Sequence, residues 1–217
     1  MASTGIGPTG ERRHYAADQI FFSTTDKRGV IVTVNSTFVA LSRYGKDQLV
    51  SAPHSVIRHP RMPSGLFYIM WERLRAGKSM MGYIENLAKD GADYLTFSTV
   101  APLSEGFISV RSAVTRPDLW EPVSRAYAQT RTLENQWRRD GVSKVDTASW
   151  GAQDLAARFA ALGFPTYDDV MRTLGPAEVD QRRRLAPVRA AGANLYIVYC
   201  ISYNIYNIYI YHTVVCI

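Results

Sequence analysis

Short runs of strand-type residues separated by turn residues dominate the first half of the chain. Residues 20–25 and 30–34 are rich in aromatic and β-branched side chains, and residues 26–29 between them have the composition of a turn that ends in glycine. We therefore predict a β-hairpin here. Two short helical segments are expected next, near residues 38–42 and 47–50.

A longer helix is predicted between this hairpin and three further strands. Its apolar residues recur at helical spacing and share one face: Leu66, Phe67, Met70, Trp71 and Leu74. Pro63 favours the first turn of the helix, and Gly77 favours its end. Strand-type runs follow at residues 80–87, 94–101 and 106–114, with an Asp-Gly turn between the first two.

This order of elements predicts the fold class. A five-stranded antiparallel sheet with short helices on one face is an α+β arrangement, and we expect it over residues 18–117. Residues 1–17 are expected to form a flexible lead. Residues 118–194 are expected to form an all-helical C-terminal extension, because Ala and charged residues dominate there and apolar residues recur at helical spacing. Its helices are predicted near residues 119–139, 147–162, 165–173 and 176–185, with breaks at glycine and proline.

The last segment, residues 195–217, differs in composition from the rest of the chain. It contains no charged residue and is dominated by Tyr and Ile. Such a change indicates a frameshift or a fusion, so we predict that this tail is not part of the functional fold. A membrane anchor is the rival interpretation, because the segment is long enough to span a bilayer.

Composition and charge narrow the function classes. The chain has 217 residues and a formal net charge of +6, with its basic residues spread thinly, so we expect no nucleic-acid binding. The cysteines are Cys200 and Cys216, so residues 1–199 cannot form a disulfide, a cysteine zinc site or a flavin–cysteine adduct. The N-terminus has no apolar signal segment, and we expect a cytoplasmic protein with no membrane association.

The sequence contains no recognisable catalytic set. It has no phosphate-binding glycine loop, no HExxH metal motif and no nucleophile elbow. We therefore predict that the protein is not an enzyme, and we assign no catalytic residue and no metal site.

Several motifs occur together in the predicted sheet region. Residues 58–63 read Arg-His-Pro-Arg-Met-Pro, Met70-Trp71 lies in the long helix, and Asn86 precedes an Asp-Gly turn. In this combination, residues 20–116 resemble a PAS sensory domain of the aerotaxis-receptor type. The resemblance implies a sheet and helices that enclose a pocket with non-covalently bound FAD. It also implies a sensor of redox state or oxygen that relays its signal to a separate signalling protein in trans and that can form a homodimer.

The resemblance places the pocket between the long helix and the sheet. It implies a lining of Phe67, Met70, Trp71, Ile84 and Asn86, with Arg58 and His59 at the edge. Trp71 would pack on the flavin ring and Asn86 would hydrogen-bond its polar edge, while Arg58 and His59 can meet a pyrophosphate. Residue chemistry alone leaves alternatives open. Trp71 can be ordinary core, Asn86 can tie down a loop, and Arg58 can pair with a nearby glutamate.

Several positions depart from the family pattern, and two of them bear on the pocket. Arg61 stands where the family has an acid, which reverses the charge near the pocket mouth, and Met80 stands where it has a tryptophan. Haem is disfavoured as the ligand because residues 64–76 contain no histidine. The departures keep a second function open: a ligand-free PAS module for interaction or dimerisation, in which residues 118–185 are the working part.

Overall fold

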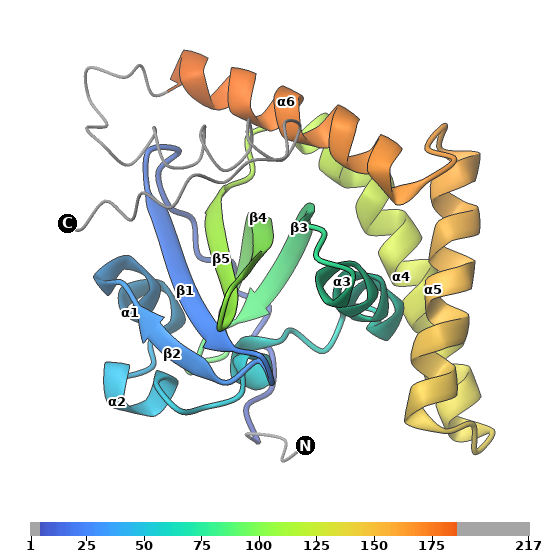
Figure 1. The fold of residues 1–217 in the computed structure, drawn as a ribbon, viewed down its shortest axis with the longest axis horizontal. Helices are drawn as coiled ribbons and strands as arrows, with labels where there is room; N and C mark the ends of the chain where they lie inside the picture. The colour runs from blue at the N-terminus through green and yellow to red at the C-terminus, as the bar shows by residue number, and fades with distance from the viewer. Residues whose placement is uncertain (1–4, 186–217) are drawn as a thin grey trace.

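The computed structural model describes residues 5–185, which are built around a five-stranded antiparallel sheet (Figure 1). The strands are β1 (Ile20–Asp26), β2 (Ile31–Val34), β3 (Met80–Leu87), β4 (Asp93–Leu103) and β5 (Gly106–Ala113). They lie in the order β2-β1-β5-β4-β3, and each neighbouring pair is antiparallel. The predicted α+β fold class is therefore confirmed, and the strands lie where the sequence pattern predicts them.

Four short helical segments connect β2 to β3. They are α1 (Ser36–Ser42), α2 (Lys46–Leu49), η1 (His54–Ile57) and α3 (Ser64–Arg75). Asn35 caps α1, because its side-chain oxygen accepts a hydrogen bond from the Phe38 backbone N–H at 3.2 Å. Phe38 then packs with Phe21 of β1 and Tyr94 of β4 in one apolar cluster, to which α2 and η1 also contribute. We call the sheet face that carries Phe21 and Tyr94 the inner face.

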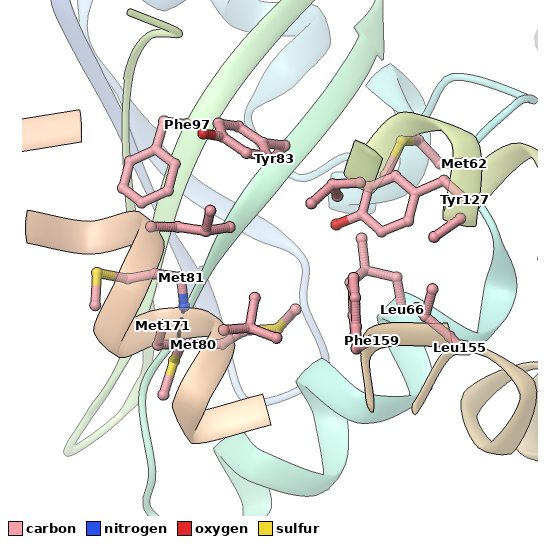
Figure 2. Close-up of a cluster of buried hydrophobic side chains, with 14 residues drawn as sticks. Met62, Leu66, Met80, Met81, Tyr83, Phe97, Tyr127, Leu155, Phe159 and Met171 are labelled. Carbon is pink, nitrogen blue, oxygen red and sulfur yellow. Dashed lines mark hydrogen bonds between the residues drawn. The ribbon is translucent and has the colours of Figure 1, made fainter. Parts of the chain in front are cut away.

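Three long helices form the C-terminal extension: α4 (Pro117–Arg139), α5 (Lys144–Ala161) and α6 (Tyr167–Leu185). The helices α4 and α6 cover the opposite face of the sheet, which we call the outer face. Its residues Tyr83 and Phe97 share a core cluster with Met171 of α6 (Figure 2). α5 packs on α3 instead, where Leu66 meets Leu155 (Figure 2). The extension therefore shares a core with the sheet region.

The helix α6 runs without a break through Gly175-Pro176, so the prediction of two helices at 165–173 and 176–185 was wrong. Pro176 removes one backbone hydrogen bond from the helix interior. The helix continues because both halves bury side chains on one face: Val170, Met171 and Leu174 before the proline, Glu178 and Arg182 after it. Gly175 also allows close packing, because a Cβ there would lie 3.0 Å from the Met81 methyl carbon.

Part of the expected flexible lead is anchored to the sheet. Asp93 at the start of β4 accepts a hydrogen bond from the Arg13 backbone N–H and donates one to the Glu11 carbonyl, at 2.7 and 2.8 Å. The Arg12 side chain reinforces this pairing through ion pairs with Glu85 at 2.6 Å and Asp93 at 2.8 Å. Residues 11–13 of the expected lead therefore contact partners more than 70 positions away in the chain.

Two further expectations concern the C-terminal tail and membrane association. The tail prediction for residues 195–217 lies outside the described residues. Within residues 5–185, no helix combines the length and the apolar character needed to cross a membrane.

Candidate functional site

A line of buried polar side chains crosses the inner face of the sheet. It is made of Asn86 on β3, Thr96 and Ser98 on β4, Arg111 on β5 and Ser23 on β1, each at most 3% exposed. Strand register places them on one face, because Asn86 pairs with Tyr94 and Arg111 pairs with both Ser98 and Phe21. We call these five residues the polar track.

Hydrogen bonds join the members of the polar track within each of its two halves, one on β3 and β4 and the other on β5 and β1. The Asn86 amide donates to the Thr96 hydroxyl at 3.3 Å, and Thr96 lies 2.8 Å from the Ser98 hydroxyl. In the half of the track formed by β5 and β1, on the same face, both terminal nitrogens of Arg111 donate to the Ser23 hydroxyl at 3.2 Å. A covered sheet face is normally apolar, and buried polar groups remain there only when they find partners. The inner face therefore carries hydrogen-bonding side chains at positions where packing alone would favour apolar side chains.

Arg111 is a buried cation with neutral neighbours. Its Nη2 donates to Nε2 of His54 at 2.5 Å, and its guanidinium lies 5.6 and 5.1 Å from the ring centroids of Phe21 and Phe38. Among residues 5–185, no carboxylate lies within 4.0 Å of it. Burial lowers the pKa of Arg111 to about 10, which still leaves it charged at neutral pH. The inner face therefore carries a fixed positive charge.

His54 is neutral beside this charge. Burial, and then the charge of Arg111, lower the pKa of His54 to about 3. Because an arginine N–H can only donate, Nε2 of His54 must be an acceptor in this contact. The imidazole proton therefore sits on Nδ1 at neutral pH.

The structure brings three of the sequence-predicted residues together at the β3 edge of the inner face. Arg58 forms an isolated antiparallel bridge with Asn86. Its guanidinium carbon lies 4.2 Å from the ring centroid of Phe67, and its Nη2 donates to the Met62 carbonyl and the Ser64 hydroxyl. Burial, and then the charge of Arg131, lower the pKa of Arg58 to about 10. Arg58 therefore does not pair with a glutamate, which was one alternative.

The other predicted lining residues lie farther along α3 and β3, and all are partly exposed. Trp71 packs edge-on against Phe107 of the inner face, with ring centroids 5.4 Å apart, and its ring tip lies against Gly29 in the β1–β2 turn. Met70 and Ile84 pack against the core cluster that contains Leu66. Ile84 pairs with Thr96 and therefore lies on the inner face. Trp71 thus reaches toward β1 and β5, away from the contact between Arg58 and Asn86.

His59 and Tyr94 each leave a buried polar atom without a partner. His59 is fully buried, and its Nδ1 accepts a hydrogen bond from the Arg61 backbone N–H at 3.1 Å. Burial lowers the pKa of His59 to about 4, so the neutral ring carries its proton on Nε2. In the part of the chain that the structure describes, neither this Nε2 nor the Tyr94 hydroxyl has a hydrogen-bond partner. Buried donors of this kind are rare unless a ligand or water meets them.

Two of the departures from the family pattern, Arg61 and Met80, have separate structural roles. Arg61 forms ion pairs with Glu85 at 3.3 Å and with Asp93 at 3.4 Å, so it neutralises the same two buried carboxylates as Arg12. Its charge is balanced there. Met80 is 2% exposed and fills core volume, so it acts as a packing residue in place of an aromatic wall.

Sequence reasoning missed Arg111, His54 and the small polar residues of β4 as members of the site. A signal was present in β4, where Thr96 and Ser98 occupy alternate positions on the same side as Tyr94. A strand that buries both faces would carry apolar residues at these positions.

Comparison with known proteins identifies related sequences, one of which is a receptor. No protein-family model matches the chain. The aerotaxis receptor of Escherichia coli (strain K12) is 32% identical over 131 residues, which covers 57% of this chain and 26% of the receptor. The chain therefore spans about a quarter of the length of that receptor.

Solved structures with a similar arrangement include PAS and light-oxygen-voltage domains. A PAS domain from Colwellia psychrerythraea is 20% identical, covers 45% of this chain and 87% of its own, and has a TM-score of 0.38. The d2 variant of RsLOV is 15% identical, with coverages of 69% and 92% and a TM-score of 0.42. A light-oxygen-voltage domain described with a flavin analogue is 18% identical, with coverages of 56% and 89% and a TM-score of 0.42.

The sequence similarity and the observed fold agree on one identification. The receptor similarity is carried by sequence, and the five-stranded sheet with its short helices is the architecture that the motifs imply. Both are those expected of a PAS sensory domain of the aerotaxis-receptor type, and the matched part of the chain is similar to that receptor.

Proposed function

We propose that this PAS domain binds FAD non-covalently at its inner face and acts as a sensor of redox state or oxygen. A PAS domain of this type has a role in sensory signal transduction; the identity of the ligand is our proposal. The observation that carries it is the polar track, together with the unpartnered donors of His59 and Tyr94. Ligand sites in proteins typically combine apolar walls with a few buried hydrogen-bonding groups.

The residues present fit the chemistry of a flavin. Phe67 and Trp71 offer aromatic surface on the side of α3, and Asn86 offers an amide that can both donate and accept. Arg58 forms no ion pair within 4.0 Å among the described residues, and the buried His59 keeps an N–H donor, so both suit a pyrophosphate. When bound, FAD supplies a ring whose charge and proton count change on reduction.

The fixed positive charge of Arg111 makes this site favour a ligand with negative charge. A buried cation with neutral partners stabilises negative charge in its surroundings more strongly than a surface cation does. Asn86, Thr96 and Ser98 can reorient their donors and acceptors when the charge of a nearby ligand changes. This rearrangement would connect the state of the ligand to the strands β3, β4 and β5.

Visible absorption of the purified protein tests the ligand. Protein purified without added cofactor, or incubated with FAD and desalted, is expected to show the absorption bands of oxidised flavin. Asn86→Ala and Trp71→Ala are each expected to weaken retention of the flavin, with Glu121→Ala on the exposed side of α4 as the matched control. A colourless protein that takes up no FAD would contradict the proposal and favour the ligand-free interaction module.

We also propose that the domain signals to a separate protein in the cytoplasm and has no enzymatic activity of its own. Trp120, Val123 and Tyr127 of the extension lie in the core shared with the sheet, so they are not available as an exposed docking stripe. Affinity capture from the host under oxidising and reducing conditions should recover a partner in one state more than in the other. Turnover of a nucleotide by the purified chain would contradict the absence of enzymatic activity. The elution volume of the purified chain in size-exclusion chromatography would test for the homodimer.

A further inference from the structure

A buried carboxylate joins the helical extension to the start of α3. Glu134 in α4 is fully buried and accepts hydrogen bonds from the backbone N–H groups of Ser64 at 2.7 Å and Gly65 at 2.8 Å. The first N–H groups of a helix have no partner within the helix, so Glu134 supplies an N-terminal cap from another segment. Arg131, one turn earlier in α4, lies 3.1 Å from the same carboxylate and balances its charge.

Two glycines make this contact tight. A Cβ on Gly65 of α3 would lie 2.2 Å from the carbonyl carbon of Gly151 in α5. A Cβ on Gly151 would lie 2.3 Å from Oε1 of Glu134. The Glu134 carboxylate and the backbones of Gly65 and Gly151 are in direct contact here, and close-packed interiors transmit displacement. A shift of the first turn of α3 is therefore passed directly to α4 and α5.

The same turn of α3 is tied to the candidate ligand site. The Ser64 hydroxyl accepts a hydrogen bond from Arg58 at 3.2 Å, while the Ser64 N–H donates to Glu134. Arg58 in turn covers the Phe67 ring and bridges to Asn86. Ser64 is thus the residue that contacts both the proposed ligand-binding arginine and the buried carboxylate of the extension.

We propose that Glu134 is a positioning residue that couples ligand binding at the inner face to the helices α4 and α5, through Ser64. The inference rests on the proposed function, because it needs a ligand whose negative charge attracts Arg58. When Arg58 turns toward such a ligand, its bond to Ser64 is lost or rearranged, and the cap on Glu134 changes with it. Ligand-free and ligand-bound states then differ in their contacts, which is the condition for a ligand to shift a conformational equilibrium.

Hydrogen–deuterium exchange of the full chain with and without FAD tests this coupling. The peptides to follow come from α5, which has no place in the predicted ligand site. FAD is expected to change their exchange rates by roughly 5- to 150-fold, the range of ordinary allosteric coupling. Ser64→Ala removes the link to Arg58 but keeps the backbone cap, and Glu134→Gln removes the charge of the cap. Both variants are expected to bind FAD and to lose most of the change in α5.

Asp154→Asn is the matched control. Asp154 is a partly buried carboxylate of α5 that accepts from Thr130 at 2.6 Å and from Arg158 at 2.7 Å. It joins α4 to α5 without any contact to α3 in the described residues, so the FAD-dependent change should survive this substitution.

The outcomes separate the coupling from the flavin proposal. If Ser64→Ala retains the full FAD-dependent change in α5, the coupling is wrong and flavin binding stands. If the wild-type protein binds no FAD, the proposed function fails and the coupling fails with it. Circular dichroism reports whether Glu134→Gln folds; if it does not, Ser64→Ala decides alone.

Discussion

Replacement of Glu178 by alanine should destabilise the protein more than any substitution on the exposed faces of the extension. Glu178 in α6 is fully buried. It accepts hydrogen bonds from the Tyr83 hydroxyl at 2.9 Å, the Thr115 N–H at 2.8 Å and the Thr115 hydroxyl at 2.6 Å. It also caps the start of α4 by accepting from the Arg116 N–H at 3.2 Å. One carboxylate thus joins β3, the end of β5, α4 and α6.

The expected loss follows from the donors that Glu178→Ala leaves behind. Each buried donor without an acceptor costs about 1–3 kcal/mol. The Arg182 guanidinium, 2% exposed and 3.9 Å from the carboxylate, loses its acidic neighbour, and breaking a buried charge pair typically costs about 3–5 kcal/mol. These contributions overlap and do not add. We expect a decrease of about 3–5 kcal/mol in the free energy of unfolding, out of a typical total of about 5–15 kcal/mol.

Urea unfolding followed by far-ultraviolet circular dichroism measures this loss. Glu178→Gln keeps the shape and one acceptor oxygen but removes the charge beside Arg182, so its loss should be smaller than that of Glu178→Ala and above about 1 kcal/mol. Glu121→Ala is the control, because its ion pair with Arg125 is exposed and should contribute less than about 0.5 kcal/mol. A loss below about 1 kcal/mol for Glu178→Ala, or one equal to that of Glu121→Ala, would refute this reasoning.

Three further predictions follow from the packing and the buried histidine. Folding lowers the pKa of His54 from 6.5 to about 3, so the unfolded chain binds a proton at a higher pH than the folded chain. The free energy of unfolding should therefore decrease as pH falls below about 6.5, by about 2 kcal/mol at pH 5. A His54→Gln variant with the same pH dependence in urea unfolding would contradict this. Pro176→Ala restores a backbone donor inside α6 and should raise stability by about 2 kcal/mol; an unchanged or lower melting temperature would show that the helix is not continuous there. Gly65→Ala places a methyl group against the backbone of Gly151 and should lower stability by about 2–3 kcal/mol, and a neutral effect on thermal unfolding would argue against the close contact of α3 with α5.

The sheet could be predicted from the sequence because its signals are local. The β-branched run before Asn35 and the Asp-Gly turn between β3 and β4 each specify a strand end within a few residues. The unbroken helix α6 could not be predicted in this way. Gly175-Pro176 is a strong local break signal, and the burial of Met171 and Leu174 against the outer face of the sheet overrides it.

The candidate site was predicted in part, for a related reason. Arg58 and Asn86 come from motifs and Phe67 from the helical pattern, and Arg58 contacts both of the others in the structure. The partners of Arg61 could not be inferred, because Glu85 and Asp93 become its neighbours only when β3 and β4 pair beneath the loop. The contact of Arg111 with His54 joins residues 57 positions apart. Neither local sequence predicts this contact.

The central claim is that the inner face of this PAS domain holds a flavin without a covalent bond. Mass spectrometry of the small molecules released when the purified protein is denatured tests it most directly. The account predicts release of FAD in roughly equimolar amount, with the protein left at the mass of its unmodified chain. Recovery of no flavin from protein that was also incubated with FAD, or of a different ligand in stoichiometric amount, would contradict it.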